Sequence, residues 1–200
     1  MWNAPFYGSC DLIMGISKQT YGINKRVLKK FGMDYKDWQI QYVPHGVSDK
    51  FKPILKGFDD YSKVGEMRTR LGLDDKDFTL FYNNRNIRRK NPGDIILAYK
   101  TFCDTLTKEE ADKCCLLMHT APVDDNGTDL PVVAKTLCPE YKVYFSANKI
   151  EPKQLNHLYN MADVTINMAS NEGFGLGTCE SLMAGTPIIV NVTGGLQDQC

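Results

Sequence analysis

The sequence predicts an α/β fold, a Rossmann-like parallel sheet with helices on both faces. Short apolar segments rich in Val, Ile, Leu and Phe recur along the chain, and segments with helical spacing separate most of them. Strands that read as apolar runs are typical of a parallel sheet buried on both sides. We found no internal repeat and no low-complexity tract in the chain.

The first elements are predicted near the amino terminus. Asp11–Ile16 is an apolar segment of strand length, and Ser17 directly follows it. Serine is a preferred helix cap, so a helix is expected from Ser17 to about Phe31. Gly32 then ends this helix, since glycine readily takes the left-handed conformation that closes helices.

A second strand is predicted at Gln39–Val43, and residues 48–65, rich in Lys, Asp, Pro and Gly, are predicted to be an exposed connection. A new series of strands and helices follows. Its strands are predicted at residues 78–82, 114–118, 143–145, 164–169 and 187–192. Its helices are predicted at residues 66–71, 92–106, 130–137 and 151–161, with a last short helix ending at Gly185.

Composition excludes several classes of function. The 200 residues include 24 basic and 24 acidic side chains, so the formal net charge is zero and no long-range field recruits nucleic acid. No apolar run is long enough to span a bilayer, and Met1–Pro5 lacks the features of a signal peptide. We therefore expect a cytoplasmic protein with no transmembrane segment and no nucleic-acid partner.

The seven cysteines are expected to be reduced and mostly buried. Their number is odd, no C-x-x-C pair is present, and several lie inside apolar runs. No group of Cys and His has the spacing of zinc ligands, so no metal site is predicted.

The most informative stretch is Ser170–Glu180, which lies between a predicted strand and a predicted helix. A strand, a glycine-rich turn and a helix N-terminus together form an anion site, because unpaired N–H groups and the helix dipole favour negative charge. Two carboxylates, Glu172 and Glu180, bracket this turn. Carboxylates accept hydrogen bonds from hydroxyls, so the pattern favours a ligand with both phosphates and sugar hydroxyls. A surface turn with solvated glutamates is the simpler alternative.

Other loops are expected at the same edge of the sheet, where ligands bind in open parallel sheets. The loop after residues 78–82 carries Arg85 and Lys90, which could clamp a diphosphate, although a basic loop is often merely solvated. The loop after residues 143–145 carries Asn148 and Ile150, whose backbone could meet a nucleobase.

Two further classes of site are not supported. The glycines at 173, 175 and 177 lack the G-x-G-x-x-G spacing of a dinucleotide site, so no nicotinamide or flavin is expected. His45, His119 and His157 have no Ser or Cys partner at a recognisable spacing, so no hydrolase triad is expected. We expect His157 to lie at the surface or half-buried on its helix.

One family resemblance is carried by these motifs. Glu172-Gly173-Phe174-Gly175-Leu176-x3-Glu180, followed by Ala184–Ile189, resembles the E-x7-E motif of the retaining group 1 glycosyltransferases (family four), which have the GT-B fold. Three other segments resemble family motifs in the expected order: Val43–Val47 with Phe51-x-Pro53, Leu71–Leu73 with Arg85 and Lys90, and Ala162–Val164. The sequence departs from the family at His45, usually Asn, and at Asn83-Asn84, often a glycine.

The resemblance implies a division into two domains. Residues 1–47 would be the end of the acceptor-side N-terminal domain and the interdomain connection. Residues 48–200 would be the nucleotide-sugar donor-binding domain, expected to be incomplete at its C-terminus.

The resemblance also implies roles for the predicted site residues. Arg85 and Lys90 would hold the donor diphosphate, Glu172 would contact the transferred sugar, and Glu180 would bind the ribose hydroxyls. The backbone of Gly173, Phe174, Gly175 and Leu176 would lie against sugar and phosphate.

Two functions are consistent with the sequence. The first is a retaining glycosyltransferase that moves a sugar from a UDP- or GDP-linked donor, without cofactor or metal, to a glycan, lipid or protein acceptor. The second is a module that binds nucleotide sugar without turnover, because most of the acceptor domain would be missing.

Overall fold

The computed structural model describes residues 4–57, 59–74 and 76–200, which divide into two compact units. Unit 1 comprises Met1–Gly46, Asn171–Leu176 and Val192–Cys200. Unit 2 comprises Val47–Ser170 and Gly177–Asn191.

Unit 1 contains a small β-α-β arrangement. Its elements are α1 (Ala4–Gly8), β1 (Ile13–Gly15), α2 (Lys18–Lys30), the 3₁₀ helix η1 (Asp37–Gln39), β2 (Ile40–Tyr42) and the 3₁₀ helix η3 (Gly194–Asp198). β1 and β2 pair in parallel, with Ile13 opposite Ile40, and α2 connects them. The predicted cap is confirmed, since the Ser17 hydroxyl accepts a hydrogen bond from the Thr20 amide. Gly32, at φ 60°, has the expected left-handed backbone.

The carboxylate of Asp198 anchors η3 within unit 1. It accepts a hydrogen bond from the Lys18 backbone amide at 2.8 Å and from the Tyr42 hydroxyl at 3.2 Å. Lys18 is the first residue of α2, so the carboxylate sits at the positive end of the helix dipole. The end of the chain is therefore held by a helix start that lies 180 residues earlier.

Unit 2 is built on a parallel sheet of five strands in the order β5-β4-β3-β6-β7. The strands are β3 (Phe78–Asn83), β4 (Cys114–His119), β5 (Lys142–Ser146), β6 (Val164–Asn167) and β7 (Ile188–Val190). The predicted fold class is confirmed. β6 ends at Asn167, earlier than predicted, because the Asn167 side chain accepts the Ala169 amide and turns the chain.

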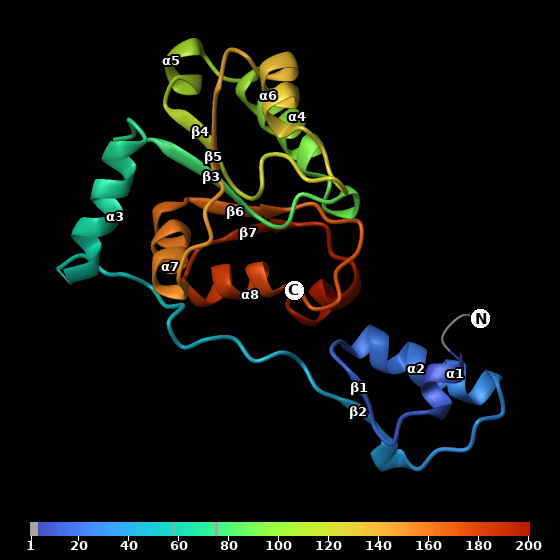
Figure 1. Ribbon diagram of the computed structural model, residues 1–200. Helices are drawn as coiled ribbons and strands as arrows, with labels where there is room; N and C mark the ends of the chain where they lie inside the picture. The colour runs from blue at the N-terminus through green and yellow to red at the C-terminus, as the bar shows by residue number, and fades with distance from the viewer. Residues whose placement is uncertain (1–3, 58, 75) are drawn as a thin grey trace. The chain divides into compact units, whose positions relative to one another are not determined.

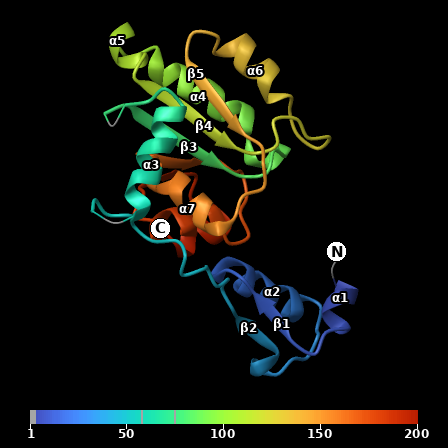
Figure 2. The ribbon, with the colours of Figure 1, turned by 60° about the vertical axis from the view of Figure 1, so that its left-hand side comes forward.

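Helices cover both faces of this sheet (Figures 1 and 2). The helices of unit 2 are α3 (Asp59–Arg70), α4 (Pro92–Cys103), α5 (Lys108–Ala111), α6 (Leu130–Leu137), α7 (Pro152–Met161) and α8 (Leu176–Met183), with the 3₁₀ helix η2 (Arg88–Lys90) before α4. Successive side chains of β3 enter two hydrophobic cores on opposite faces of the sheet. Tyr82 packs with Tyr99 of α4 in one core, and Phe81 packs with Tyr159 of α7 in the other. The alternation is what a strand buried on both faces requires.

Two sequence predictions about this region were wrong for a single reason. α3 begins at Asp59, inside the segment 48–65 that was predicted to be an exposed connection. It packs along α7, so His157 is only 6% exposed and not at the surface or half-buried as predicted. The His157 ring lies 3.7 Å from the carboxylate of Asp60 on α3.

The cysteines are free thiols, as predicted. Cys103, Cys114, Cys115 and Cys138 are buried, Cys179 is half-buried, and Cys10 and Cys200 are exposed. Within the described ranges, no helix has the length and apolar character needed to cross a membrane.

Candidate functional site

The predicted site residues are divided between the two units. Glu172, Gly173, Phe174, Gly175 and Leu176 belong to unit 1. Arg85, Lys90, Asn148, Ile150 and Glu180 belong to unit 2. Within unit 2 these residues follow the carboxyl ends of β3, β5 and β6, as the sequence predicted.

The loop after β3 carries an exposed guanidinium. Arg85, whose side chain is 65% exposed, forms an ion pair with Asp124, with 3.1 Å between Nε and Oδ2. The hydrogen bond from the Asn126 backbone amide is the main cause that lowers the pKa of the Asp124 carboxyl, and the hydrogen bond from Arg85 lowers it further. The exposed guanidinium is therefore held at the edge of the sheet by a carboxylate whose own side chain is only 14% exposed.

A buried amide holds the same loop against the loop after β4. The Asn86 side chain is fully buried, and its Nδ2 donates to the carbonyl of Ala121 at 3.1 Å and to that of Thr128 at 2.6 Å. Its Oδ1 accepts the Thr128 amide at 3.0 Å. One side chain thus fixes the backbone on both sides of Asp124.

Lys90 is 7% exposed and lies at the end of η2. The residues next to it form hydrogen bonds with the segment after β6. The Arg89 carbonyl accepts the Ser170 amide at 2.8 Å. The Asn91 side chain donates to the Met168 carbonyl at 2.8 Å, and Asn91 itself has a left-handed backbone with φ 50°. The backbone around Lys90 is therefore well ordered by hydrogen bonds within unit 2.

Glu180 of α8 is linked by hydrogen bonds to β3. The Tyr159 hydroxyl donates to Oε2 of Glu180 at 2.8 Å and accepts from Nδ2 of Asn83 at 2.7 Å. Burial raises the pKa of Glu180, while the hydrogen bond from Tyr159 lowers it. Burial raises the pKa of Tyr159 well above its usual value, so this phenol stays protonated and can donate.

The first turn of α8 approaches the same group closely. A Cβ at Gly177 would lie 3.1 Å from the Asn83 carbonyl oxygen and 3.3 Å from the Tyr159 hydroxyl. Glycine here lets the helix N-terminus approach the carboxyl end of β3. Free N–H groups of that first turn would suit an anionic ligand.

Asn148 and Ile150 line two adjoining hollows in unit 2. One hollow, of about 410 Å³, is lined by Asn148, Ser146 and Leu158, among others. The other, of about 520 Å³, is lined by Ile150 and shares Ser146 and Leu158 with the first. Both lie between α3, β5 and α7, and Arg85 and Glu180 are not among their lining residues in the described part of the chain.

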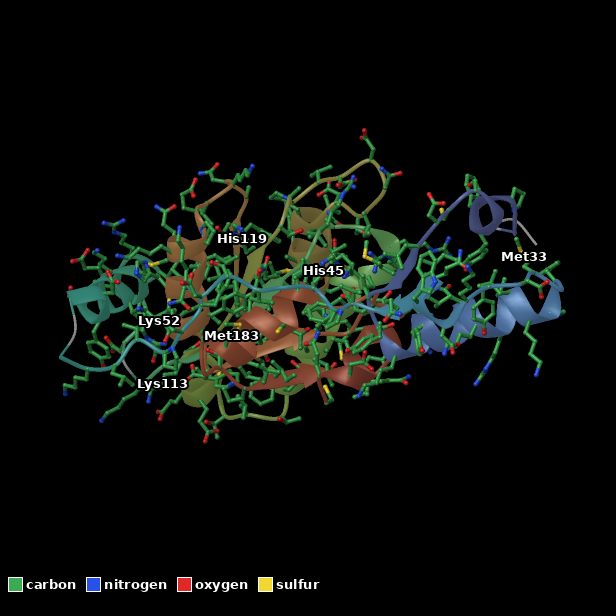
Figure 3. All side chains as sticks on the ribbon, turned by 90° about the horizontal axis from the view of Figure 1, so that it is seen from below. Met33, His45, Lys52, Lys113, His119 and Met183 are labelled. Atoms are coloured by element: carbon green, nitrogen blue, oxygen red, sulfur yellow. The ribbon has the colours of Figure 1, made fainter. Side chains whose placement is uncertain are left out.

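The His119 ring, at the end of β4 and labelled in Figure 3, is engaged in a hydrogen bond. Its Nδ1 lies 2.9 Å from the Ser146 hydroxyl. Burial lowers the pKa of the ring, so it is neutral near pH 7. It bridges the ends of β4 and β5 and leads towards the loop with Asn148.

In unit 1, the predicted glycine-rich turn is locked by η3. The Glu172 carbonyl accepts the Gly195 amide at 2.8 Å, and Glu172 is 5% exposed. Gly175 has φ 91°, and a Cβ there would lie 2.5 Å from Leu196. Gly194 and Gly195 allow a close backbone approach, and the backbone approached is that of Glu172 and Gly173.

Phe174 is buried at the centre of this turn. Its ring meets His45 edge-on, with 5.4 Å between centroids, and Figure 3 shows His45 on the extended segment after β2. Its carbonyl accepts a hydrogen bond from Nε2 of Gln199 at 2.5 Å. The turn is therefore shaped by side chains that lie far from it in sequence.

Sequence reasoning missed the residues that support the site. Tyr159, Asn83 and Gln199 were not selected as site residues, and Asn83 was noted only as a departure from a family pattern. Tyr159 lies in an apolar helical pattern that looks like ordinary core, so no local signal distinguishes it. Among the described residues, no group of His, Cys, Asp and Glu could hold a metal ion.

A comparison with known protein families identifies the family of this chain. The family model described as "Glycosyl transferases group 1" matches residues 64–200, and the chain belongs to that family. The match covers both glutamates, Arg85 and Lys90.

Two curated relatives share a name. The alpha-monoglucosyldiacylglycerol synthase of Streptococcus pneumoniae is 30% identical over 151 residues, covering 74% of this chain and 32% of the relative. The enzyme of the same name from Acholeplasma laidlawii is 23% identical over 190 residues, covering 94% of this chain and 43% of the relative. The chain spans less than half the length of these relatives.

A solved structure supports the fold. HepE of Anabaena, solved in complex with UDP and glucose, is 14% identical and superposes with a TM-score of 0.66, covering 95% of this chain and 46% of HepE. At this identity the likeness concerns the GT-B fold alone, of which the chain is a part.

Proposed function

We propose that this chain provides the donor site of a retaining glycosyltransferase that uses a nucleoside diphosphate sugar, UDP- or GDP-linked. The observation that carries the proposal is Glu180. This half-buried carboxylate lies beyond the end of β3, and Tyr159 holds one of its oxygens at 2.8 Å. Its remaining accepting capacity suits the hydroxyls of a ribose.

The other predicted residues complete the proposed donor site. Arg85 and Lys90 bind the diphosphate, and the first turn of α8 adds N–H groups that favour negative charge. Glu172 contacts the transferred sugar, with the backbone of Gly173–Leu176 beside sugar and phosphate. Asn148 and Ile150 lie beside the nucleobase of the donor.

The chemistry needs stabilisation of the charge that forms during sugar transfer. As the sugar departs, negative charge grows on the diphosphate and the sugar becomes oxocarbenium-like. Arg85 and Lys90 stabilise the leaving group electrostatically, so no metal is required for this role. Glu172 and Glu180 orient sugar and ribose, which keeps the reacting carbon in place for transfer.

We also propose a division into domains and a cytoplasmic location. Residues 1–47 belong to the acceptor-side domain and the interdomain connection, and residues 48–200 belong to the donor-binding domain. The buried free thiols suit the reducing cytoplasm. The acceptor is a glycan, lipid or protein.

A second function uses the same proposed site: the chain binds nucleotide sugar without turnover. The two functions differ in product formation: the enzyme releases UDP or GDP from its sugar nucleotide, and the binding module does not.

Isothermal titration of the chain with UDP, GDP and their glucose conjugates tests the donor site. We expect binding by at least one of them, weakened roughly tenfold or more by Arg85→Ala or Lys90→Ala through the loss of a charge-assisted contact. Lys135→Ala removes an exposed charge on α6 and serves as the control. The donor-site proposal fails if none of these ligands binds. The diphosphate assignment fails if both variants bind like the unaltered chain.

A further inference from the structure

Three side chains from three elements of unit 2 form one continuous hydrogen-bonded group. Asn83 ends β3, Tyr159 lies in α7, and Glu180 lies in α8. The Asn83 amide donates to the Tyr159 oxygen at 2.7 Å, and the Tyr159 hydroxyl donates to Oε2 of Glu180 at 2.8 Å. We refer to these residues as the Asn83–Tyr159–Glu180 relay.

The direction of the relay follows from its geometry. Tyr159 is fully buried, and its ring is wedged edge-on between Phe51 at 5.9 Å and Phe81 at 5.2 Å. The hydroxyl therefore cannot move away from Glu180. Because its oxygen already accepts from Asn83, its single proton is directed to the carboxylate.

The relay changes what Glu180 can do. A hydrogen bond from a neutral phenol to a carboxylate favours the ionised form and fixes its orientation. This contact opposes the effect of burial, which raises the pKa of Glu180. When Glu180 is ionised, one of its oxygens accepts the hydrogen bond from Tyr159, and the other can accept hydrogen bonds from a ligand. A ribose offers two hydroxyl groups that can donate to it.

We propose that Tyr159, oriented by Asn83, is the positioning residue through which Glu180 selects ribonucleoside over 2′-deoxyribonucleoside diphosphates. The inference rests on the proposed function, since it assigns the ligand of Glu180 to the donor ribose. It goes further by naming two residues that set the selectivity without touching the nucleotide. Selectivity is large at such sites because a buried acceptor left without its donor is costly.

The test compares dissociation constants of the chain for UDP and 2′-deoxy-UDP, and for GDP and 2′-deoxy-GDP. The measured quantity is the ratio of deoxy to ribo dissociation constants for the better-bound base. We expect a ratio of roughly ten or more in the unaltered chain, as for loss of one hydrogen bond to a charged group. Glu180→Gln should lower this ratio towards one.

Tyr159→Phe removes only the hydroxyl and should lower the ratio by about threefold or more, mostly through weaker ribonucleotide binding. Asn83→Ala leaves the ring in place and should lower it less, which keeps the test valid if Tyr159→Phe folds poorly. Tyr99→Phe, a buried tyrosine in the other core, is the matched control and should leave the ratio unchanged.

A pH series separates positioning from a merely structural role. The phosphates titrate equally in the deoxy and ribo ligands, so the ratio reports Glu180. Without the Tyr159 hydroxyl the Glu180 carboxyl protonates more readily, so selectivity in Tyr159→Phe should be lost at a higher pH than in the unaltered chain.

Each outcome decides one proposition. No binding of any nucleoside diphosphate to the unaltered chain would refute the donor site itself. Binding whose ratio falls in Glu180→Gln but stays unchanged in both Tyr159→Phe and Asn83→Ala would overturn the relay and leave the donor site standing. A ratio of one in the unaltered chain would overturn ribose selection by Glu180.

Discussion

The backbone of Gly194 lies directly against the carbonyl oxygen of Glu172, so a Cβ at residue 194 would overlap that oxygen. The adjoining Gly195 amide donates to the same oxygen at 2.8 Å. Gly194 also has φ 56°, a left-handed conformation that favours glycine. The position of Glu172 within unit 1 therefore depends on residues of η3.

Gly194→Ala should destabilise this turn and weaken nucleotide binding. The left-handed backbone alone costs about 1–2 kcal/mol for a residue with a Cβ, and the overlap with the Glu172 carbonyl adds to it. We expect a lower urea midpoint and a higher dissociation constant for UDP or GDP.

Gly22→Ala is the matched control in the same unit. Gly22 lies within α2, and an added Cβ would meet no atom within 4 Å. Alanine is the better helix former by roughly 1 kcal/mol, so this variant should be stabilised and should bind as before. Equal stability of Gly194→Ala and the unaltered chain would show that the turn relaxes freely.

The order of strands and helices could be predicted because each strand is a distinct apolar run bounded by turn residues. The start of α3 could not. Its sequence, Asp59–Arg70, is mostly polar, and among its described side chains Val64 and Met67 are the apolar ones that pack in the core. A helix of this kind is stabilised by its partner α7, which no local pattern reveals.

The site shows the same limit. Arg85, Lys90, Glu172 and Glu180 were selected from charge and from a motif, both of which are visible in sequence. Tyr159 acts through a hydroxyl that contacts Glu180, 21 residues later in the chain, and such a contact exists only once the helices have packed.

Arg68→Met should strongly destabilise unit 2. Arg68 is buried, and its guanidinium donates to the carbonyls of Asp74, Met161 and Asp77. Methionine leaves these buried acceptors without a donor, at about 1–3 kcal/mol each for those that water cannot reach. Urea unfolding should show a loss of roughly 3 kcal/mol.

Arg70→Met provides the comparison, since Arg70 is exposed on the same helix. Its effect should stay within about 0.5 kcal/mol, as for most surface substitutions. Similar losses in the two variants would contradict the role assigned to the Arg68 hydrogen bonds.

The thiols should fall into two groups of reactivity. Cys10 and Cys200 are exposed, whereas burial raises the pKa of Cys114 and of Cys138 to about 11. The thiolate is the reactive form, so the buried thiols should be unreactive in the folded chain. Maleimide labelling followed by peptide mass spectrometry should modify Cys10 and Cys200 first. Fast labelling of Cys114 or Cys138 without denaturant would contradict the structure.

The stability of unit 2 should decrease as the pH falls below the usual pKa of histidine. Burial is the main cause that lowers the pKa of His157 from 6.5, and Lys63 and Lys153 act in the same direction, against Asp60. The unfolded chain therefore binds a proton at a higher pH than the folded chain does. Stability is fully present above the unfolded pKa and is lost as the pH drops towards the lower folded value. His119, whose pKa is also lowered by burial, contributes with the same sign.

Urea midpoints at about pH 7.5 and about pH 5.5 measure this loss directly. His157→Gln keeps a polar side chain of similar reach but cannot be protonated, so the difference between the two midpoints should shrink. His119→Gln should remove a further part, and the double variant most of it, because the two rings lie on different elements and titrate independently. A chain that is more stable at the lower pH would mean that the imidazole between α3 and α7 gains rather than loses from protonation. An undiminished difference in His157→Gln would mean that this ring does not cause the loss of stability.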